Sequence, residues 1–139
     1  MHTYDEIPTP AAVVDLDRLD ANLRRMQDYV DGHGLRLRPH IKTHKARWIA
    51  GEQVRLGAAG VTVATPIEAE EIGTAAPGML IAYPPVGPRA GAIAGVVAAA
   101  DGDVLVGLDS VAAVAALRAA LAAEGTDRPV GVLVEVDLG

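Results

Sequence analysis

Three basic side chains alternate in the stretch LRLRPHIKTHK, residues 35–45: His40, Lys42 and His44. Side chains two residues apart share one face of a β-strand, so a strand through 35–43 would bring the three together. A lysine that is partly desolvated among cationic neighbours holds more of its amine in the neutral form, which attacks carbonyl carbons. The pattern makes Lys42 a candidate Schiff-base lysine for a sugar, a keto acid or pyridoxal phosphate.

Two other interpretations of this stretch stay open from the residues alone. A lysine that follows a strand is most often simply solvated. His40 and His44 have the i, i+4 spacing of metal ligands, but no carboxylate partner stands near them in the sequence. Weaker candidates follow later strands: Tyr83, Asp109 and Asp137.

The elements that must position these residues alternate along the chain. Short Val/Leu/Ile-rich runs predict strands at 11–16, 35–43, 61–65, 78–85, 103–109 and 130–139, with helical patterns between them. Leu19, Leu23, Met26 and Val30 predict the buried face of the first helix, with Asp17 as its N-cap. Further caps are expected from Thr65, within the capping box TPIE, and from Ser110.

Glu68, Glu70 and Glu71 fall in the first turns of the helix after TPIE. A favourable interaction with the helix macrodipole is sufficient to account for them.

Strands that alternate with helices predict an α/β fold with a parallel sheet covered by helices. Such a sheet is doubly wound or part of a (β/α)8 barrel. No strand is followed by G-x-G-x-x-G or by a phosphate-binding loop, which weakens a dinucleotide-binding fold. A whole barrel takes about 250 residues, so 139 residues are expected to supply a partial TIM barrel of about five βα units.

Composition excludes several classes of function. A net charge of −6 and 3% aromatic residues argue against nucleic-acid binding, which needs a basic face or stacking side chains. Without cysteine there is no disulfide, thiolate zinc site or thiol nucleophile. The chain shows neither a signal-peptide pattern nor an apolar run that would span a membrane, so a cytoplasmic protein without membrane partners is expected.

The ordered motifs resemble a known family. TPAAVVDLDRLDANLRRM (9–26), LRLRPHIKTHK (35–45) and GVTVATPIEAEEI (60–72) are similar to the N-terminal part of the D-threonine aldolase and D-serine dehydratase group. These are pyridoxal-phosphate enzymes of the alanine racemase-like fold type III. LIAYPPVGP, VGLDSVAAVAAL and VLVEVDLG continue the resemblance in order, and RPHIKTHK is its most specific piece.

The resemblance implies site residues and domains. Lys42 would form the Schiff base with pyridoxal 5'-phosphate, and His40 would lie beside the cofactor. Residues 1–16 would form an N-terminal strand that pairs with a C-terminal β-domain outside this chain. Residues 17–139 would form a truncated cofactor-binding barrel domain, with 35–43 as its first strand and 130–139 as its fifth.

The function implied is that of a lyase acting on small D-amino acids, by retro-aldol cleavage or by dehydration. A racemase, a non-catalytic pyridoxal-phosphate-binding protein, a cofactor-free Schiff-base aldolase and a half-barrel that acts only in association with another chain are the alternatives. A full-length form is expected to be a homodimer, and any divalent metal would be bound by residues outside this chain. The 139 residues are therefore expected to be an inactive fragment, because the other half of the pocket lies beyond Gly139.

Overall fold

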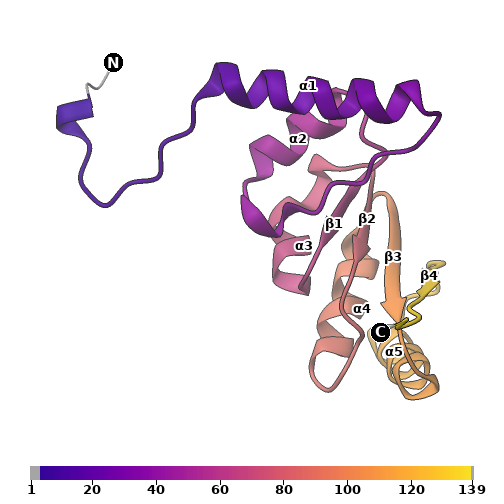
Figure 1. The fold of residues 1–139 in the computed structure, drawn as a ribbon. Coiled ribbons are helices and arrows are strands. Elements are labelled where there is room, and N and C mark those ends of the chain that lie inside the picture. Colours follow the sequence, from indigo (N-terminus) through magenta and orange to yellow (C-terminus); the bar gives the residue numbers. More distant parts are fainter. Residues whose placement is uncertain (1–3, 139) are drawn as a thin grey trace.

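A computed structural model describes residues 4–138. The described residues form five α-helices and four strands, and after the first helix the remaining four helices alternate with the four strands (Figure 1). The helices are α1 (Leu16–Gly32), α2 (Arg47–Arg55), α3 (Pro66–Ile72), α4 (Arg89–Ala99) and α5 (Val111–Glu124); the strands are β1 (Val61–Val63), β2 (Gly78–Ile81), β3 (Asp103–Leu108) and β4 (Gly131–Val134). Three 3-10 turns accompany them, at Tyr4–Glu6, Ile41–Thr43 and Gly73–Ala75.

The four strands form one parallel sheet in the order β1-β2-β3-β4. Each strand is joined to the next through a helix, as parallel pairing requires. The predicted α/β class is confirmed, and the sheet has the form of part of a barrel wall.

One face of the sheet carries the core. Val61, Val63, Ile81 and Val106 are each 0% exposed and pack against apolar side chains of the helices, including Ile93 of α4. Residues between them on the strands point to the opposite face, which no helix covers among the described residues. We call this second side the open face; by the strand register its central row is Thr62, Leu80, Leu105 and Gly131.

The strand expected at 35–43 is wrong: the structure has a single bridge there, at His40, and a 3-10 turn after it. Residues 37–40 run beside β1: the Pro39 carbonyl accepts the Thr62 N–H at 2.8 Å, and His40 forms a single parallel bridge with Thr62. The chain then closes into the 3-10 turn Ile41–Thr43. Proline has no N–H to donate to a ladder, and the turn satisfies the following groups locally. The alternation that placed Lys42 and His44 on one strand face therefore does not apply.

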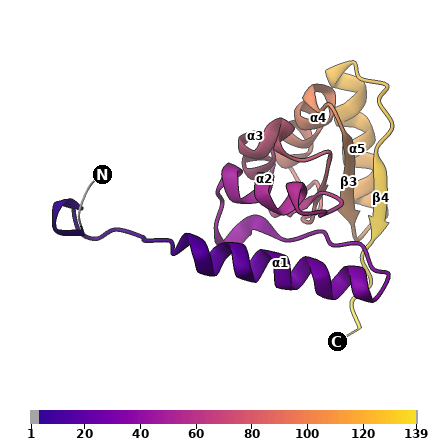
Figure 2. The ribbon, with the colours of Figure 1, turned by 90° about the horizontal axis from the view of Figure 1, so that it is seen from above.

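Helix α1 differs from its prediction in two details. Asp15, not Asp17, is the N-cap, with its side chain accepting the Arg18 N–H at 3.0 Å. Met26 is 52% exposed, and Gln27 is buried beside it. The helix lies alongside α2 in both views (Figures 1 and 2). Gly57, just after α2, leaves room for the Gln27 amide, which a Cβ at that position would crowd. Leu19, Leu23 and Val30 keep the predicted face, and Gln27 takes the place of Met26 on it.

The other predicted caps are confirmed. Thr65 Oγ1 accepts the Glu68 N–H at 3.3 Å, with Pro66 at the first position of α3. Ser110 Oγ accepts the Ala113 N–H at 3.2 Å at the start of α5. These local signals set where the two helices begin.

The segment before α1 extends away from the rest of the chain (Figure 1). Residues 11–15 are exposed and form no strand ladder with any described residue. Residues 1–3 of the predicted N-terminal strand lie outside the described residues. Its pairing with a further domain stays a prediction.

Candidate active site

Lys42 lies in the 3-10 turn that directly follows the segment paired with β1. Its backbone N–H donates to Nδ1 of His40 at 3.3 Å, and the carbonyl of Ile41 accepts two later N–H groups, at 3.2 and 2.8 Å. Ile41 is 1% exposed and anchors the turn in the core, whereas the Lys42 side chain is exposed. The turn thus presents an accessible amine on a fixed backbone.

His44 does not provide a cationic neighbour for Lys42. Its Nδ1 accepts the Ala46 N–H at 3.1 Å, so the neutral ring carries its proton on Nε2. Burial lowers the pKa of His44, and an interaction with Gln53 opposes this shift only in part. The ring is therefore neutral at pH 7 and belongs to the packing between the turn and α2.

A second lysine closes the turn. Lys45 has φ +48°, and among the described residues no other side-chain-bearing residue has a positive φ. Its Nζ lies 3.1 Å from Oε1 of Glu68, whose side chain is only 9% exposed. The other carboxylate oxygen, Oε2, accepts the Ala64 N–H at 2.7 Å. Glu68 therefore ties the Lys42 turn to the end of β1, a role beyond the macrodipole interaction that the sequence predicted.

The ionised form of the Glu68 carboxyl is stabilised by its neighbours. Burial raises the pKa of its carboxyl, but the Ala64 N–H and the Lys45 ammonium outweigh burial and hold the pKa below its usual value. The carboxylate form is consequently present at neutral pH.

Small residues lie at the C-terminal ends of β1, β2 and β3 on the open face. By the alternation of the strands, Ala64 comes after β1, Ala82 after β2, and Gly107 within β3, in register with Leu133 of β4. A Cβ at Gly107 would lie 2.8 Å from the Ala82 carbonyl oxygen, so a larger residue does not fit there. These three residues, which we call the small-residue shelf, lie near the C-terminal ends of the strands, where parallel α/β folds place their functional groups.

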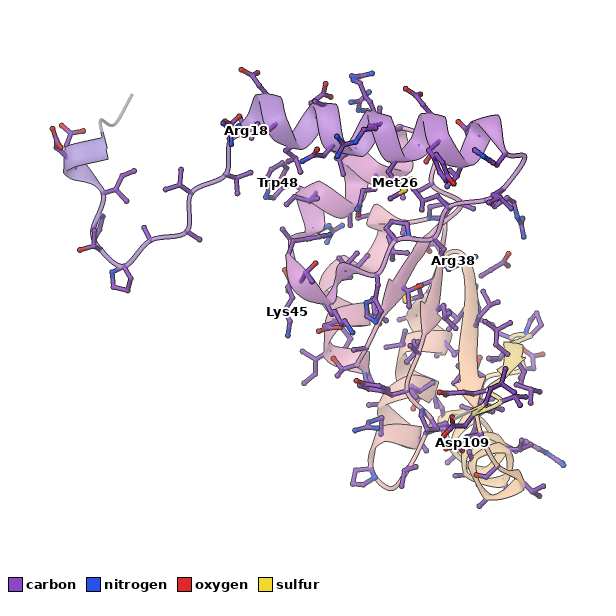
Figure 3. The ribbon with its side chains drawn as sticks, viewed as in Figure 1. Arg18, Met26, Arg38, Lys45, Trp48 and Asp109 are labelled. Atoms are coloured by element: carbon purple, nitrogen blue, oxygen red, sulfur yellow. The ribbon has the colours of Figure 1, made fainter. Side chains whose placement is uncertain are left out.

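Arg38 occupies the opposite end of the same face (Figure 3). Its Nη1 is buried and has no hydrogen-bond acceptor among the described residues. The guanidinium passes so close to Gly60 that a Cβ there would overlap both it and the Gly78 carbonyl oxygen. Arg38 thus belongs to the N-terminal layer of the sheet, away from Lys42.

The weaker candidates do not gather around Lys42 in any contact of the described residues. Tyr83 is half exposed, with the Arg89 guanidinium 5.9 Å from its ring centre. Asp109 is exposed at the start of α5, and Asp137 follows β4. No group of three His, Asp or Glu in residues 4–138 is arranged to hold a metal ion.

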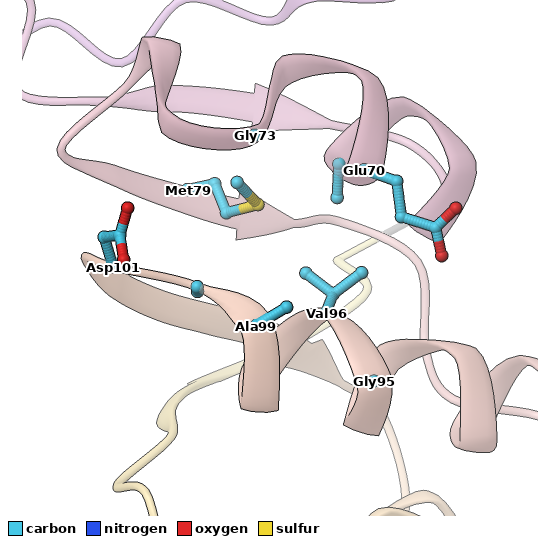
Figure 4. Close-up of a pocket in the computed structure, with 9 residues that line it drawn as sticks. Glu70, Gly73, Met79, Gly95, Val96, Ala99 and Asp101 are labelled. Atoms are coloured by element: carbon cyan, nitrogen blue, oxygen red, sulfur yellow. The ribbon is translucent and has the colours of Figure 1, made fainter.

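A cavity of about 420 Å³ lies elsewhere, between α3, α4 and β2 (Figure 4). Met79 and Val96 line it with small residues, and Glu70 and Asp101 stand at its rim. It lies on the helix-covered side of the sheet and contains none of the predicted site residues.

None of the described helices is long and apolar enough to cross a membrane.

Comparison with known proteins decides the family. The family model for the alanine racemase N-terminal domain matches residues 14–139. The chain belongs to this family. It is 52% identical over 65 residues to the D-threo-3-hydroxyaspartate dehydratase of Delftia sp. strain HT23, which is 47% of this chain and 17% of that protein. It is 49% identical over 55 residues to a D-threonine aldolase of Arthrobacter sp., or 40% and 14% of the two chains.

Solved structures agree over nearly the whole chain. The D-threonine aldolase from Filomicrobium marinum superposes with a TM-score of 0.88 at 35% identity, covering 98% of this chain and 36% of the aldolase. A C353A variant of D-threo-3-hydroxyaspartate dehydratase gives 0.84 at 36% identity, covering 98% and 35%. The chain therefore corresponds to about a third of these alanine racemase-like enzymes, and the predicted resemblance is confirmed.

The alanine racemase-like aldolases and dehydratases depend on pyridoxal phosphate. Among the residues of this family member, Lys42 has the chemistry to hold the aldehyde end of that cofactor. It offers an exposed amine near the C-terminal ends of the strands. His40 holds the backbone of Lys42 and so fixes the origin of its side chain.

Lys45 and the buried role of Glu68 were missed from the sequence. A signal for them was present, because TPIE predicts an acidic residue that folds back at a helix start. A capping box would direct the Glu68 carboxylate to the N–H of the N-cap residue, Thr65. In the structure the carboxylate instead accepts the N–H of Ala64, and it pairs with Lys45, which lies 23 residues earlier in the chain. Only tertiary structure brings that lysine to the helix.

Proposed function

We propose that this chain supplies the cofactor-anchoring lysine, Lys42, of a pyridoxal-phosphate-dependent lyase acting on D-amino acids that carry a β-hydroxyl group. The observation that carries the proposal is the exposed Lys42 amine on a fixed turn at the C-terminal end of a parallel sheet. The names of the aldolase and dehydratase relatives support the substrate class.

The chemistry of the chain's own residues is limited and specific. The Lys42 amine would condense with the cofactor aldehyde, forming a C=N bond and releasing water. Bound pyridoxal phosphate supplies an electron sink for the carbanion that forms when a bond at the substrate Cα breaks. Lys42, once displaced by the substrate amine, would carry a proton to or from one face of the site. His40 would hold the Lys42 backbone in place and border the ring.

The choice of reaction is a separate part of the proposal. Cleavage of the Cα–Cβ bond gives retro-aldol products, whereas loss of the α-proton and the β-hydroxyl gives dehydration. D-Threonine, D-serine and D-threo-3-hydroxyaspartate are the substrates to test. Since the chain covers 36% of the length of the Filomicrobium aldolase, turnover must be measured apart from cofactor attachment.

Cofactor attachment is tested by incubating the protein with pyridoxal phosphate, reducing with borohydride and mapping the labelled peptide by mass spectrometry. We expect a visible absorbance band and label on Lys42, both abolished in Lys42→Arg. Label distributed without preference for Lys42 would contradict the proposal. Absence of turnover by this chain alone does not count against the proposal, because the chain covers 36% of the length of the Filomicrobium aldolase.

Metal dependence, dimer formation and the N-terminal strand belong to the same proposal for a longer protein. The exposed, unpaired state of residues 11–15 supports a partner for that segment beyond the described residues. Addition of Mn²⁺ or EDTA to the activity assay tests the metal, and light scattering at several protein concentrations tests the homodimer.

A further inference from the structure

The chain has two lysines, three residues apart and on the same turn: Lys42 and Lys45. Both side chains are exposed, Lys45 by 66%, so accessibility alone does not decide which amine reacts with an aldehyde. Their partners differ. Lys45 is paired with Glu68, whereas Lys42 Nζ has no ion pair or hydrogen bond within residues 4–138.

Glu68 is held in place independently of Lys45. Its Oε2 accepts the Ala64 N–H at 2.7 Å, and its own N–H donates to Thr65 Oγ1 at 3.3 Å. The carboxylate is thus fixed by the end of β1 and the start of α3, with Oε1 directed at the Lys45 amine. The Glu68 carboxylate is therefore already in position for the Lys45 ammonium, and the ion pair does not have to order the Glu68 side chain.

The turn itself brings Lys45 to this carboxylate. Its N–H donates to the Ile41 carbonyl oxygen at 2.8 Å, and its φ of +48° is a conformation that favours glycine. The backbone therefore accepts a less favourable shape that orients the Lys45 side chain toward Glu68. A glycine here would suit the backbone and would lose the ion pair.

We propose that Glu68 determines which of the two lysines takes an aldehyde, by engaging Lys45 in an ion pair and leaving Lys42 as the reactive amine. The inference rests on the proposed function, since it concerns the site at which the aldehyde attaches.

Reaction at Lys45 is disfavoured because it removes a partner from the buried Glu68 carboxylate. Condensation at Lys45 requires its ammonium to lose a proton, its nitrogen to bond to the aldehyde carbon, and water to leave. That sequence would break the contact with Oε1 and leave a carboxylate that is 9% exposed with one fewer donor. Condensation at Lys42 breaks no such contact. Attachment at Lys42 is therefore favoured although both amines are accessible.

The test compares label on the two lysines after treatment with pyridoxal phosphate and borohydride, quantified by peptide mass spectrometry. Glu68→Gln keeps the size and an acceptor for the Ala64 N–H but removes the charge. Because Lys45 is largely exposed, the ion pair is of the modest surface kind, and we expect the Lys45:Lys42 labelling ratio to rise about three- to fivefold. Glu70→Gln, an exposed residue of the same helix, is the matched control and should leave the ratio unchanged.

A measurement on the unmodified protein keeps the inference testable if Glu68→Gln does not fold. Trace labelling with acetic anhydride should modify Lys42 at least about twice as fast as Lys45, with the difference shrinking as NaCl is raised. Equal rates at low salt, or an unchanged labelling ratio in folded Glu68→Gln, would overturn the role of Glu68. Failure of Lys42 to take pyridoxal phosphate in any variant would instead overturn the proposed function.

Discussion

The two faces of the sheet differ in what their side chains do. On the helix-covered face, large aliphatic residues such as Ile81 and Val106 are 0% exposed and fill the core. On the open face the side chains change in kind from one end to the other, from Arg38 with its glycines to the small-residue shelf beside the Lys42 turn. Packing therefore specifies one face, while the other carries the partly exposed Leu80, Leu105 and Leu133 between its two ends.

The largest expected effect separates the two faces directly. Ile81→Ala leaves a cavity in the core and should lower the free energy of unfolding by about 2–5 kcal/mol. Its neighbour Leu80 faces the other way and is partly exposed, so Leu80→Ala should cost about 1 kcal/mol, in proportion to the smaller area buried. Urea unfolding measures the free energy of unfolding of both variants. Equal losses would show that the open face is packed as tightly as the helix-covered face.

A smaller effect is expected at the N-terminal end of the open face. Gly60→Ala places a Cβ against Arg38 and the Gly78 carbonyl, at a backbone φ of +150°, and should cost more than about 1 kcal/mol. Gly95→Ala in α4 is the control, since nothing lies within 4 Å of its Cβ and alanine favours the helix. A Gly60→Ala variant as stable as the original would mean that Arg38 and the backbone at Gly78 both move aside at no cost.

Two groups near the Lys42 turn, His44 and Glu68, make the free energy of unfolding depend on pH. Burial holds the pKa of His44 below its unfolded value near 6.5, so the folded state binds fewer protons there. The contribution of neutral His44 is complete above the unfolded pKa and is lost as pH falls toward the folded one. Urea midpoints should decline below about pH 6.5, and His44→Asn should flatten that decline.

Glu68 acts in the same direction at lower pH. Its folded pKa is depressed, so its contribution is present above the unfolded value and is lost as pH falls through the folded value. Glu68→Gln should therefore remove a stability loss in the acid range and leave the decline due to His44. A profile in Glu68→Gln that matches the original at every pH would contradict the ion pair with Lys45.

The smallest effect is expected on β4, whose residues are all exposed. Val134 is 77% exposed, although it is paired in register with the buried Leu108 of β3. Val134→Lys should change the free energy of unfolding by less than about 0.5 kcal/mol. Urea unfolding measures this change, and a loss of more than about 1 kcal/mol would show that β4 is packed in solution.

Local signals in the sequence determined much of this protein. Alternating apolar runs predicted the four strands from β1 to β4 and the helices between them, Thr65 and Ser110 set two helix starts, and RPHIKTHK pointed to Lys42. Each of these depends on residues within a few positions of one another, so the chain carries the information locally.

Tertiary structure decided the rest. That Lys42 sits in a 3-10 turn and not on a strand depends on the Ile41 side chain being held in the core while its carbonyl closes the turn. The burial of Gln27 in place of Met26 depends on the contact of α1 with the glycine after α2. The pairing of Lys45 with Glu68 joins residues 23 positions apart. Such contacts exist only once helices pack on the sheet, because no periodicity in the sequence records which side chain meets another across that distance.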